Sequence, residues 1–287
     1  MPRVLLALSI TIVVIAAITG APEDAYAQWE VYDTFSEGRI DPAKWRGFEV
    51  AGALASPNTE IERQVILSHW KFGKRRSGTL HEKLVAYGSA ASDSGSTSHT
   101  TGLQVTDPSA IIGIAAKVAV IDAVAKGCVA NSIAARARAQ VVGEFFNDGS
   151  SSGPGDRTGD IISGIQKHLD SNTGKEIAAF ITRCNDSACI SQTTLAAHLF
   201  SATWHFGQPH ILQVAWDAAN DQFIYTVNPG GPGEESQVLS YGVSDSDPPA
   251  LDFKQLSLNL TTSNCLGDQR RTAMEAAFDK AEILPAP

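Results

Sequence analysis

The amino-acid sequence predicts an all-β protein built as a two-sheet antiparallel sandwich. Segments rich in Gly, Pro, Asn, Asp and Ser recur along its 287 residues and leave stretches between them that are mostly short enough for strands. Several of these stretches alternate apolar with polar residues, as strands buried on one face do. In the segment 252–260, for example, Leu256, Leu258 and Leu260 share one face, which should belong to the core. No internal repeat and no linker between unlike halves is visible, so one domain is expected.

The first 27 residues have the pattern of an export signal. Arg3 supplies a positive charge, a mostly apolar stretch runs from Val4 to Ala21, and Ala25-Tyr26-Ala27 has the small residues of a cleavage site. We therefore expect 1–27 to be a signal peptide and 28–287 to be one secreted domain, extracellular or periplasmic, with no membrane attachment after cleavage. The alternative, a retained membrane anchor, is disfavoured by the polar and small residues that interrupt the apolar stretch.

The charge balance bears on the class of partner. With 22 basic against 31 acidic residues, the chain has a net charge of −9 at pH 7. A surface of that sign repels phosphate backbones and anionic membranes. Nucleic acid is therefore not an expected partner.

The four cysteines follow the export signal, and an oxidising compartment favours disulfides. Four cysteines allow three pairings. Closure of a short loop favours a bond between Cys184 and Cys189, whose ends are already near each other, and leaves Cys128 to pair with Cys265.

Two strand predictions concern an alanine-rich segment whose composition favours helix. Within it, Arg136, Arg138 and Gln140 alternate with alanines. A strand places these three side chains on one face, whereas a helix spreads them around its circumference. We therefore predict strands over 114–122 and 133–147. A helix over 112–126 remains as the alternative.

The two ends of the domain carry a resemblance to a known fold. Val31-Tyr32-Asp33-Thr34-Phe35 with Trp45 near the start, and Met274-Glu275-Ala276-Ala277-Phe278-Asp279 near the finish, resemble the opening and closing strands of secreted jelly-roll domains of the concanavalin A-like lectin/glucanase superfamily, including LamG-like ones. The stretch from Arg136 to Ile165 is similar to secreted bacterial sandwich proteins of unassigned activity. The resemblance implies a concanavalin A-like jelly roll. Lectins, hydrolases, lyases and adhesion modules share this fold, so it implies no single reaction.

From this we expect a carbohydrate-binding or extracellular recognition module without catalysis, whose partner is a polysaccharide or other glycan. Asp, Asn and Arg side chains suit sugar hydroxyls, and an aromatic ring suits a sugar face. The candidate ligand-binding residues are Arg138, Asn147, Asp148, Asp156, Arg157, His168 and Arg183. The candidate rings are Trp70, Trp204 and Tyr87.

Five of these charged residues should converge at one end or on one face of the sandwich. Phe145-Phe146 should anchor one side of the Gly149–Gly155 loop in the core, and the strand after Gly159 should anchor the other. The predicted cluster is Arg138, Asp148, Asp156, Arg157 and Arg183. An ion-pair network that fixes one loop is an equally weighted interpretation.

Two enzyme classes are alternatives, a polysaccharide lyase before a glycoside hydrolase. Gln166-Lys167-His168 resembles the Gln-Ile-His strand of jelly-roll alginate lyases, but their Tyr-Phe-Lys-Ala-Gly strand has no counterpart. A retaining glycosidase needs two carboxylates about 5 Å apart. Glu60 and Glu62 are the nearest such pair, and Glu62 bonded to a neighbouring Lys or Arg is the simpler interpretation. A structural surface protein is the third alternative.

A structural calcium ion is possible where the first and last strands meet, because Asp33 and Asp279 would lie close if those strands pair. The simpler interpretation is that Asp33 caps a turn and Asp279 faces solvent. The sequence has no zinc-type spacing of Cys and His, and we expect no other cofactor.

Overall fold

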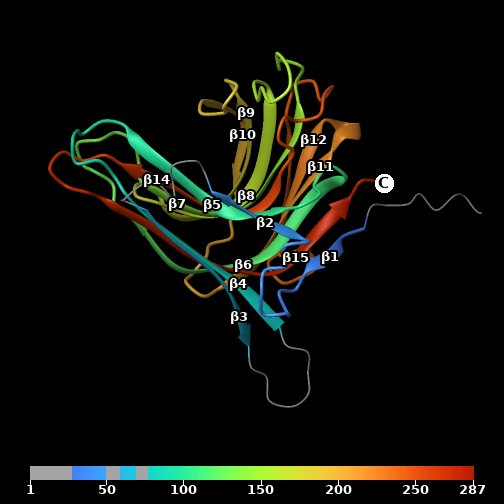
Figure 1. The fold of residues 1–287 in the computed structure, drawn as a ribbon, viewed down its shortest axis with the longest axis horizontal. Helices are drawn as coiled ribbons and strands as arrows, with labels where there is room; N and C mark the ends of the chain where they lie inside the picture. The colour runs from blue at the N-terminus through green and yellow to red at the C-terminus, as the bar shows by residue number, and fades with distance from the viewer. Residues whose placement is uncertain (1–27, 50–58, 69–76) are drawn as a thin grey trace, which may run out of the picture.

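The computed structural model describes residues 28–49, 59–68 and 77–287; the predicted signal peptide lies outside this part of the chain. The protein is an all-β, two-sheet antiparallel jelly-roll sandwich (Figure 1). Sheet A has the strand order β13 (Glu235–Ser240), β12 (Gln222–Val227), β11 (Pro209–Asp217), β6 (Ile111–Ala125), β15 (Arg271–Pro285), β4 (Ser77–Tyr87) and β3 (Thr59–Ser68), with β1 (Glu30–Asp33) also paired to β15. Sheet B has the order β10 (Gln192–Leu199), β9 (Gly174–Cys184), β8 (Asp160–Asp170), β7 (Arg136–Asn147), β14 (Lys254–Ser263), β5 (Ser96–Val105) and β2 (Trp45–Glu49).

The part of the chain that the structure describes holds no helix long and apolar enough to cross a membrane.

The alanine-rich segment forms two long strands, β6 in sheet A and β7 in sheet B. Both strand predictions are confirmed, except that residues 133–135 precede β7, and the helical alternative over 112–126 is wrong. Ala137 and Ala139 are fully buried against sheet A. The small side chains on this face allow β7 to pack closely against β6 and β15 of sheet A. Packing between the sheets therefore overrides the helix propensity of alanine.

The first and last strands of the domain lie side by side, as the resemblance of its two ends implies. Glu30 of β1 is paired with Ile283 of β15, and Asp33 with Ala281 (Figure 1). The three leucines of β14 are fully buried, as the alternation in the sequence predicts.

Both predicted disulfides are present. Cys128 and Cys265 join the β6–β7 connection to the β14–β15 connection across 137 residues of sequence, whereas Cys184 and Cys189 close a loop with a separation of 5.

Removing these two disulfides should have unequal costs, because a cross-link restricts the unfolded chain more when it closes a longer loop. Chain-entropy arguments give about 5 kcal/mol for the Cys128–Cys265 bond and about 2 kcal/mol for the Cys184–Cys189 bond. Urea unfolding of the C128S/C265S and C184S/C189S variants would measure both losses. An equal or larger loss for the C184S/C189S variant would contradict the expectation.

Candidate functional site

A groove of about 790 Å³ crosses the face of sheet B that points away from sheet A. It extends over six strands, from β5 to β10. Period-two alternation creates this face: Arg138, Gln140 and Val142 of β7 line the groove, while the alanines between them point into the core. The residues that line it are Ser98, Thr100, Arg138, Gln140, Val142, Arg157, Ile162, Gln166, Phe180, Thr182, Ala188, Cys189, Ile190, Gln192, Thr194, Leu251, Phe253, Gln255, Asn259 and Thr261.

The middle of the groove is lined by carboxamides from three adjacent strands. Gln140 donates from Nε2 to Oε1 of Gln166 at 2.7 Å, and Asn259 donates from Nδ2 to the Thr100 hydroxyl at 2.7 Å. Gln255 accepts a hydrogen bond from Gln104 at 3.3 Å. Each carboxamide has two N–H donors and two acceptor lone pairs, so these bonds hold the side chains in place and leave further hydrogen-bonding capacity. The floor can therefore offer both donors and acceptors to a polar ligand.

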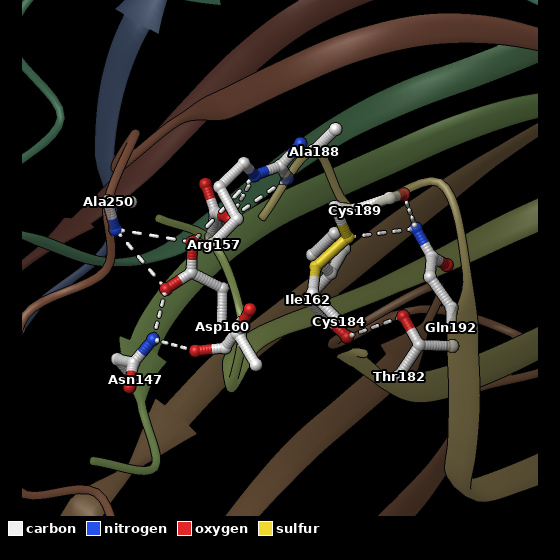
Figure 2. Close-up of polar contacts among 12 residues, drawn as sticks. Asn147, Arg157, Asp160, Ile162, Thr182, Cys184, Ala188, Cys189, Gln192 and Ala250 are labelled. Carbon is white, nitrogen blue, oxygen red and sulfur yellow. Dashed lines mark hydrogen bonds and ion pairs between the residues drawn. A yellow bond between two sulfur atoms is a disulfide. The ribbon is translucent and has the colours of Figure 1, made fainter. Parts of the chain in front are cut away.

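One end of the groove is apolar. Val142, Ile162, Phe180 and Phe253 pack around the Cys184–Cys189 disulfide in a small cluster separate from the main core. Figure 2 shows the disulfide beside Ile162, with the carboxamide of Gln192 directed at Cys189.

A second, polar hollow of about 250 Å³ lies at the other end. Arg138 and Gln166 line both hollows, so the two form one trough. Here Arg136 is paired with Asp170 at 2.6 Å, and Nε2 of His168 lies 2.7 Å from Glu176. Burial lowers the pKa of His168, although Glu176 acts in the opposite direction. The imidazole is therefore neutral near pH 7.

Arg157, at the apolar end, contacts two buried carboxyl groups, those of Glu144 and Asp160, and Figure 2 shows it beside Asp160. Arg157 donates from Nε and Nη2 to Oε1 of Glu144 at 3.0 and 2.9 Å, and its Nε lies 3.7 Å from Asp160. Asp160 also accepts hydrogen bonds from Asn147 at 2.7 Å and from the Ala250 backbone at 3.2 Å. Burial, followed by the neighbouring Asp160 carboxyl, raises the pKa of Glu144 to about 8, although Arg157 opposes this. Glu144 is therefore protonated at neutral pH and accepts both hydrogen bonds as an uncharged acid.

The five charged residues that were predicted to converge make separate contacts instead of one shared network. Arg138 and Arg157 line the same groove. Arg183 pairs with Asp148 at 2.5 Å, and the Asp148 N–H bonds to the Gly159 carbonyl at 3.0 Å, which brings the two loop ends together as expected. Asp156 instead accepts hydrogen bonds from its own loop, including the Thr158 N–H at 2.9 Å, and these hydrogen bonds lower its pKa.

Of the other predicted site residues, His168 borders the trough and Asn147 does not. The Asn147 side chain is 1% exposed and bonded to Thr158 and Asp160, which makes it a support for the loop. The ring predictions differ from the structure as well. Trp204 is 1% exposed with its indole N–H on the Glu176 carbonyl, Tyr87 belongs to β4 of sheet A, and Trp70 lies outside the described residues. The aromatic rings at the groove are Phe180 and Phe253.

Sequence reasoning missed the carboxamides, the two phenylalanines and Glu144. A signal for part of this set exists: Gln255 and Asn259 occupy the positions between the buried leucines of β14 and so must point away from the core. That β14 lies beside β7 could not be read from the sequence.

The acid pair considered for glycoside hydrolysis lies elsewhere. Glu60 and Glu62 are exposed on β3, the edge strand of sheet A. Glu62 is 3.2 Å from Lys83, as the simpler interpretation predicts. Neither residue lines the groove.

Protein donors satisfy the two residues considered for calcium. Asp33 accepts hydrogen bonds from the Phe35 N–H at 2.7 Å and the Trp45 indole at 2.8 Å, so it caps a turn, and Asp279 lies 3.1 Å from Lys117. Among the described residues, the one group with clustered ligand atoms is Asp93 with Cys128 and Cys265, whose sulfurs are already joined in a disulfide. In the part of the chain that the structure describes, Asp33 and Asp279 belong to no cluster of metal-ligand atoms.

No family model and no curated protein matches the chain. Solved structures do. A beta-1,3-glucanase from Mycobacterium marinum is 13% identical, with a TM-score of 0.42, over 88% of this chain and 97% of the other. An alginate lyase from Klebsiella pneumoniae is 10% identical, with a TM-score of 0.39, over 88% and 99%. Lectin II from Ulex europaeus is 11% identical, with a TM-score of 0.30, over 83% and 97%. At such identities and TM-scores the likeness carries no activity over to this chain.

Proposed function

We propose that this protein binds an extended glycan in the groove of sheet B and does so without cleaving it. The observation that carries the proposal is the row of carboxamides Gln140, Gln166, Gln255 and Asn259, held by one another and by their neighbours along a groove that crosses six strands. A sugar chain presents many hydroxyl groups that both donate and accept, and a fixed carboxamide matches both roles. The groove volume of about 790 Å³ lies within the range of small-molecule and oligosaccharide sites.

The compartment proposed for this function is outside the cytoplasm. The protein has two disulfides, and Cys189 of the Cys184–Cys189 bond lines the groove. Disulfides are typical of proteins that function in an oxidising environment.

A polysaccharide lyase is the second candidate, supported by the position of Gln166 and His168, the two residues of the lyase-like strand, beside Arg138. Arg138 is directly opposite His168 in the β7–β8 pairing, and Gln166 Nε2 lies 3.4 Å from His168 Nδ1. A lyase must also abstract a proton beside the uronate carboxylate. The described residues that line the trough include no tyrosine, and both ring nitrogens of His168 already have protein partners, Gln166 and Glu176, so binding without cleavage is the better supported function.

One experiment separates these functions: incubation of the purified mature protein with a panel of neutral, uronate-containing and sulfated polysaccharides. Retention on a polysaccharide without new chain ends is the expected result. Unsaturated ends would instead identify a lyase, reducing ends without unsaturation a hydrolase, and absence of both retention and products a structural role.

Replacing Gln166 with alanine should weaken binding to the retained polysaccharide about tenfold, since one or two hydrogen bonds of about 1 kcal/mol each are lost. Isothermal titration calorimetry measures the affinity. The matched control is Q64A, because Gln64 is exposed on β3 of sheet A, outside the groove. Equal affinities of Q166A and the wild type would remove Gln166 from the binding site.

A further inference from the structure

Arg138 occupies the junction of the two hollows that form the trough. Its side chain is partly buried on the outer face of sheet B. Its hydrogen bonds all leave from Nη1 and end on neutral oxygens: Oδ1 of Asn259 and, at 3.1 Å, Oγ1 of Thr261. A guanidinium has five N–H donors, so the Nε and Nη2 edge still has donors to offer.

The carboxylates around Arg138 already have other partners. Asp170 is paired with Arg136 and Asp160 with Arg157, whereas Glu176 accepts a hydrogen bond from the neutral imidazole of His168. Within the described part of the chain, no carboxylate lies within ion-pair distance of Arg138, and Asp170 reaches it only through a weaker charge interaction. Burial, with a smaller contribution from the neighbouring Arg136, lowers the pKa of Arg138 to about 10. Arg138 therefore remains a cation at neutral pH, in surroundings that do not stabilise its charge.

A partly desolvated cation without a counter-ion is costly, and the cost falls when an anion supplies the missing charge. Arginine is suited to planar or tetrahedral oxyanions because two parallel N–H groups can bind two oxygens at once. Asn259 and Thr261 fix the guanidinium in advance, so little side-chain entropy is lost on binding. Gln166 lines the same part of the trough and adds an uncharged donor.

We propose that Arg138 forms an anion subsite, and that the groove selects glycans with carboxylate or sulfate substituents over neutral glycans. This inference rests on the proposed function, because it names the class of sugar chain that the same groove binds. It also reconciles an acidic protein, of net charge −9, with an acidic ligand: a single unpaired arginine in the trough provides local attraction within an otherwise repulsive surface.

The test compares polymers that differ only in charge. Affinities are measured by calorimetry for a polyuronate, for the same polymer after reduction of its carboxyl groups to alcohols, and for a sulfated derivative of that reduced polymer. We expect at least tenfold tighter binding of one anionic form than of the reduced neutral form. The stronger of the two anionic arms identifies carboxylate or sulfate as the substituent.

Variants then locate the effect. R138Q should lose the preference for the anionic polymer while retaining affinity for the neutral one, and R138K should show an intermediate preference because it keeps the charge and loses the paired N–H groups. R39Q is the control, since Arg39 is 72% exposed and pairs with Glu37 away from the groove. An unchanged preference in R138Q would overturn the inference.

The wild-type comparison alone keeps the inference testable if R138Q does not fold. Equal affinity of the wild type for anionic and neutral polymers would overturn the anion subsite and leave glycan binding intact. Failure to bind any polymer would overturn the proposed function itself.

Discussion

Replacing Arg157 with alanine should lower the free energy of unfolding by about 3–5 kcal/mol, because Arg157 is the cation that offsets two buried carboxyl groups. The side chains of Glu144 and Asp160 are both 0% exposed, and the Arg157 side chain is 16% exposed. Without the guanidinium, Asp160 stays buried without its nearby cation, and Glu144 loses both of its bonds to Arg157. Urea denaturation at pH 7 measures the loss.

R183A is the matched comparison, since Arg183 also pairs with an acid of the same loop region but is 25% exposed. Its loss should be about 1 kcal/mol, as for other partly exposed pairs. If R157A left stability unchanged and abolished glycan retention, Arg157 would be a ligand-binding residue, as the sequence-based binding hypothesis has it. A large loss of stability assigns it a structural role, in agreement with the ion-pair interpretation.

The stability of the protein should pass through a minimum between about pH 7 and 8, because two buried groups act in opposite directions. The pKa of Glu144 is raised to about 8, so its stabilising contribution is present below pH 4.5 and is lost as the pH rises towards 8. Lys167 is fully buried, and its ammonium donates to the carbonyls of Val118 and Gln208 at 2.8 and 2.7 Å. Burial lowers its pKa to about 7, so its contribution is present above 10.5 and is lost as the pH falls towards 7.

A pKa shift of one unit corresponds to about 1.4 kcal/mol, so each group should change the free energy of unfolding by several kcal/mol. The measurement is the difference in the free energy of unfolding between wild type and variant across the pH range. The Glu144→Gln variant keeps an uncharged side chain of the same shape, so it should match the wild type near pH 4.5 and exceed its stability at pH 9. The Lys167→Met variant should remove the rise in stability above pH 7. Burial lowers the pKa of His210 to about 4, so its loss of stability with falling pH opposes the gain from Glu144 between pH 6.5 and 4.5, and the profile should level off there. A wild-type profile that is flat from pH 5 to 10 would contradict both assignments.

The sequence was sufficient to predict two packed sheets and to predict which face of several strands is buried. Alternation alone places Arg138 and Gln140 opposite the buried Ala137 and Ala139, although the alanines favour helix. The short Cys184–Cys189 loop determined the disulfide pairing by local closure, which needs no tertiary information.

The residues that line the groove could not be predicted in full, because they depend on which strands lie beside β7. Local sequence does not specify which strands are neighbours in a sheet. Segments more than one hundred residues apart supply Gln140 and Gln255 to the same groove, and β14 pairs with β7 without a hairpin turn to reveal it. Glu144 was missed for a related reason. A single acid in an apolar strand becomes notable only when Arg157 and Asp160 are seen beside it.

The most direct test of glycan binding in the groove is to fill it and measure the affinity. Thr182 of β9 lines the groove, and a tryptophan at this position would occupy it; Gln64 on β3 of sheet A is the matched exposed position. Calorimetric titration of the retained polysaccharide into both variants should show at least tenfold weaker binding to T182W and wild-type binding to Q64W, with thermal unfolding confirming that both fold. Wild-type affinity in T182W, or a loss confined to Q64W, would place the glycan outside the groove of sheet B.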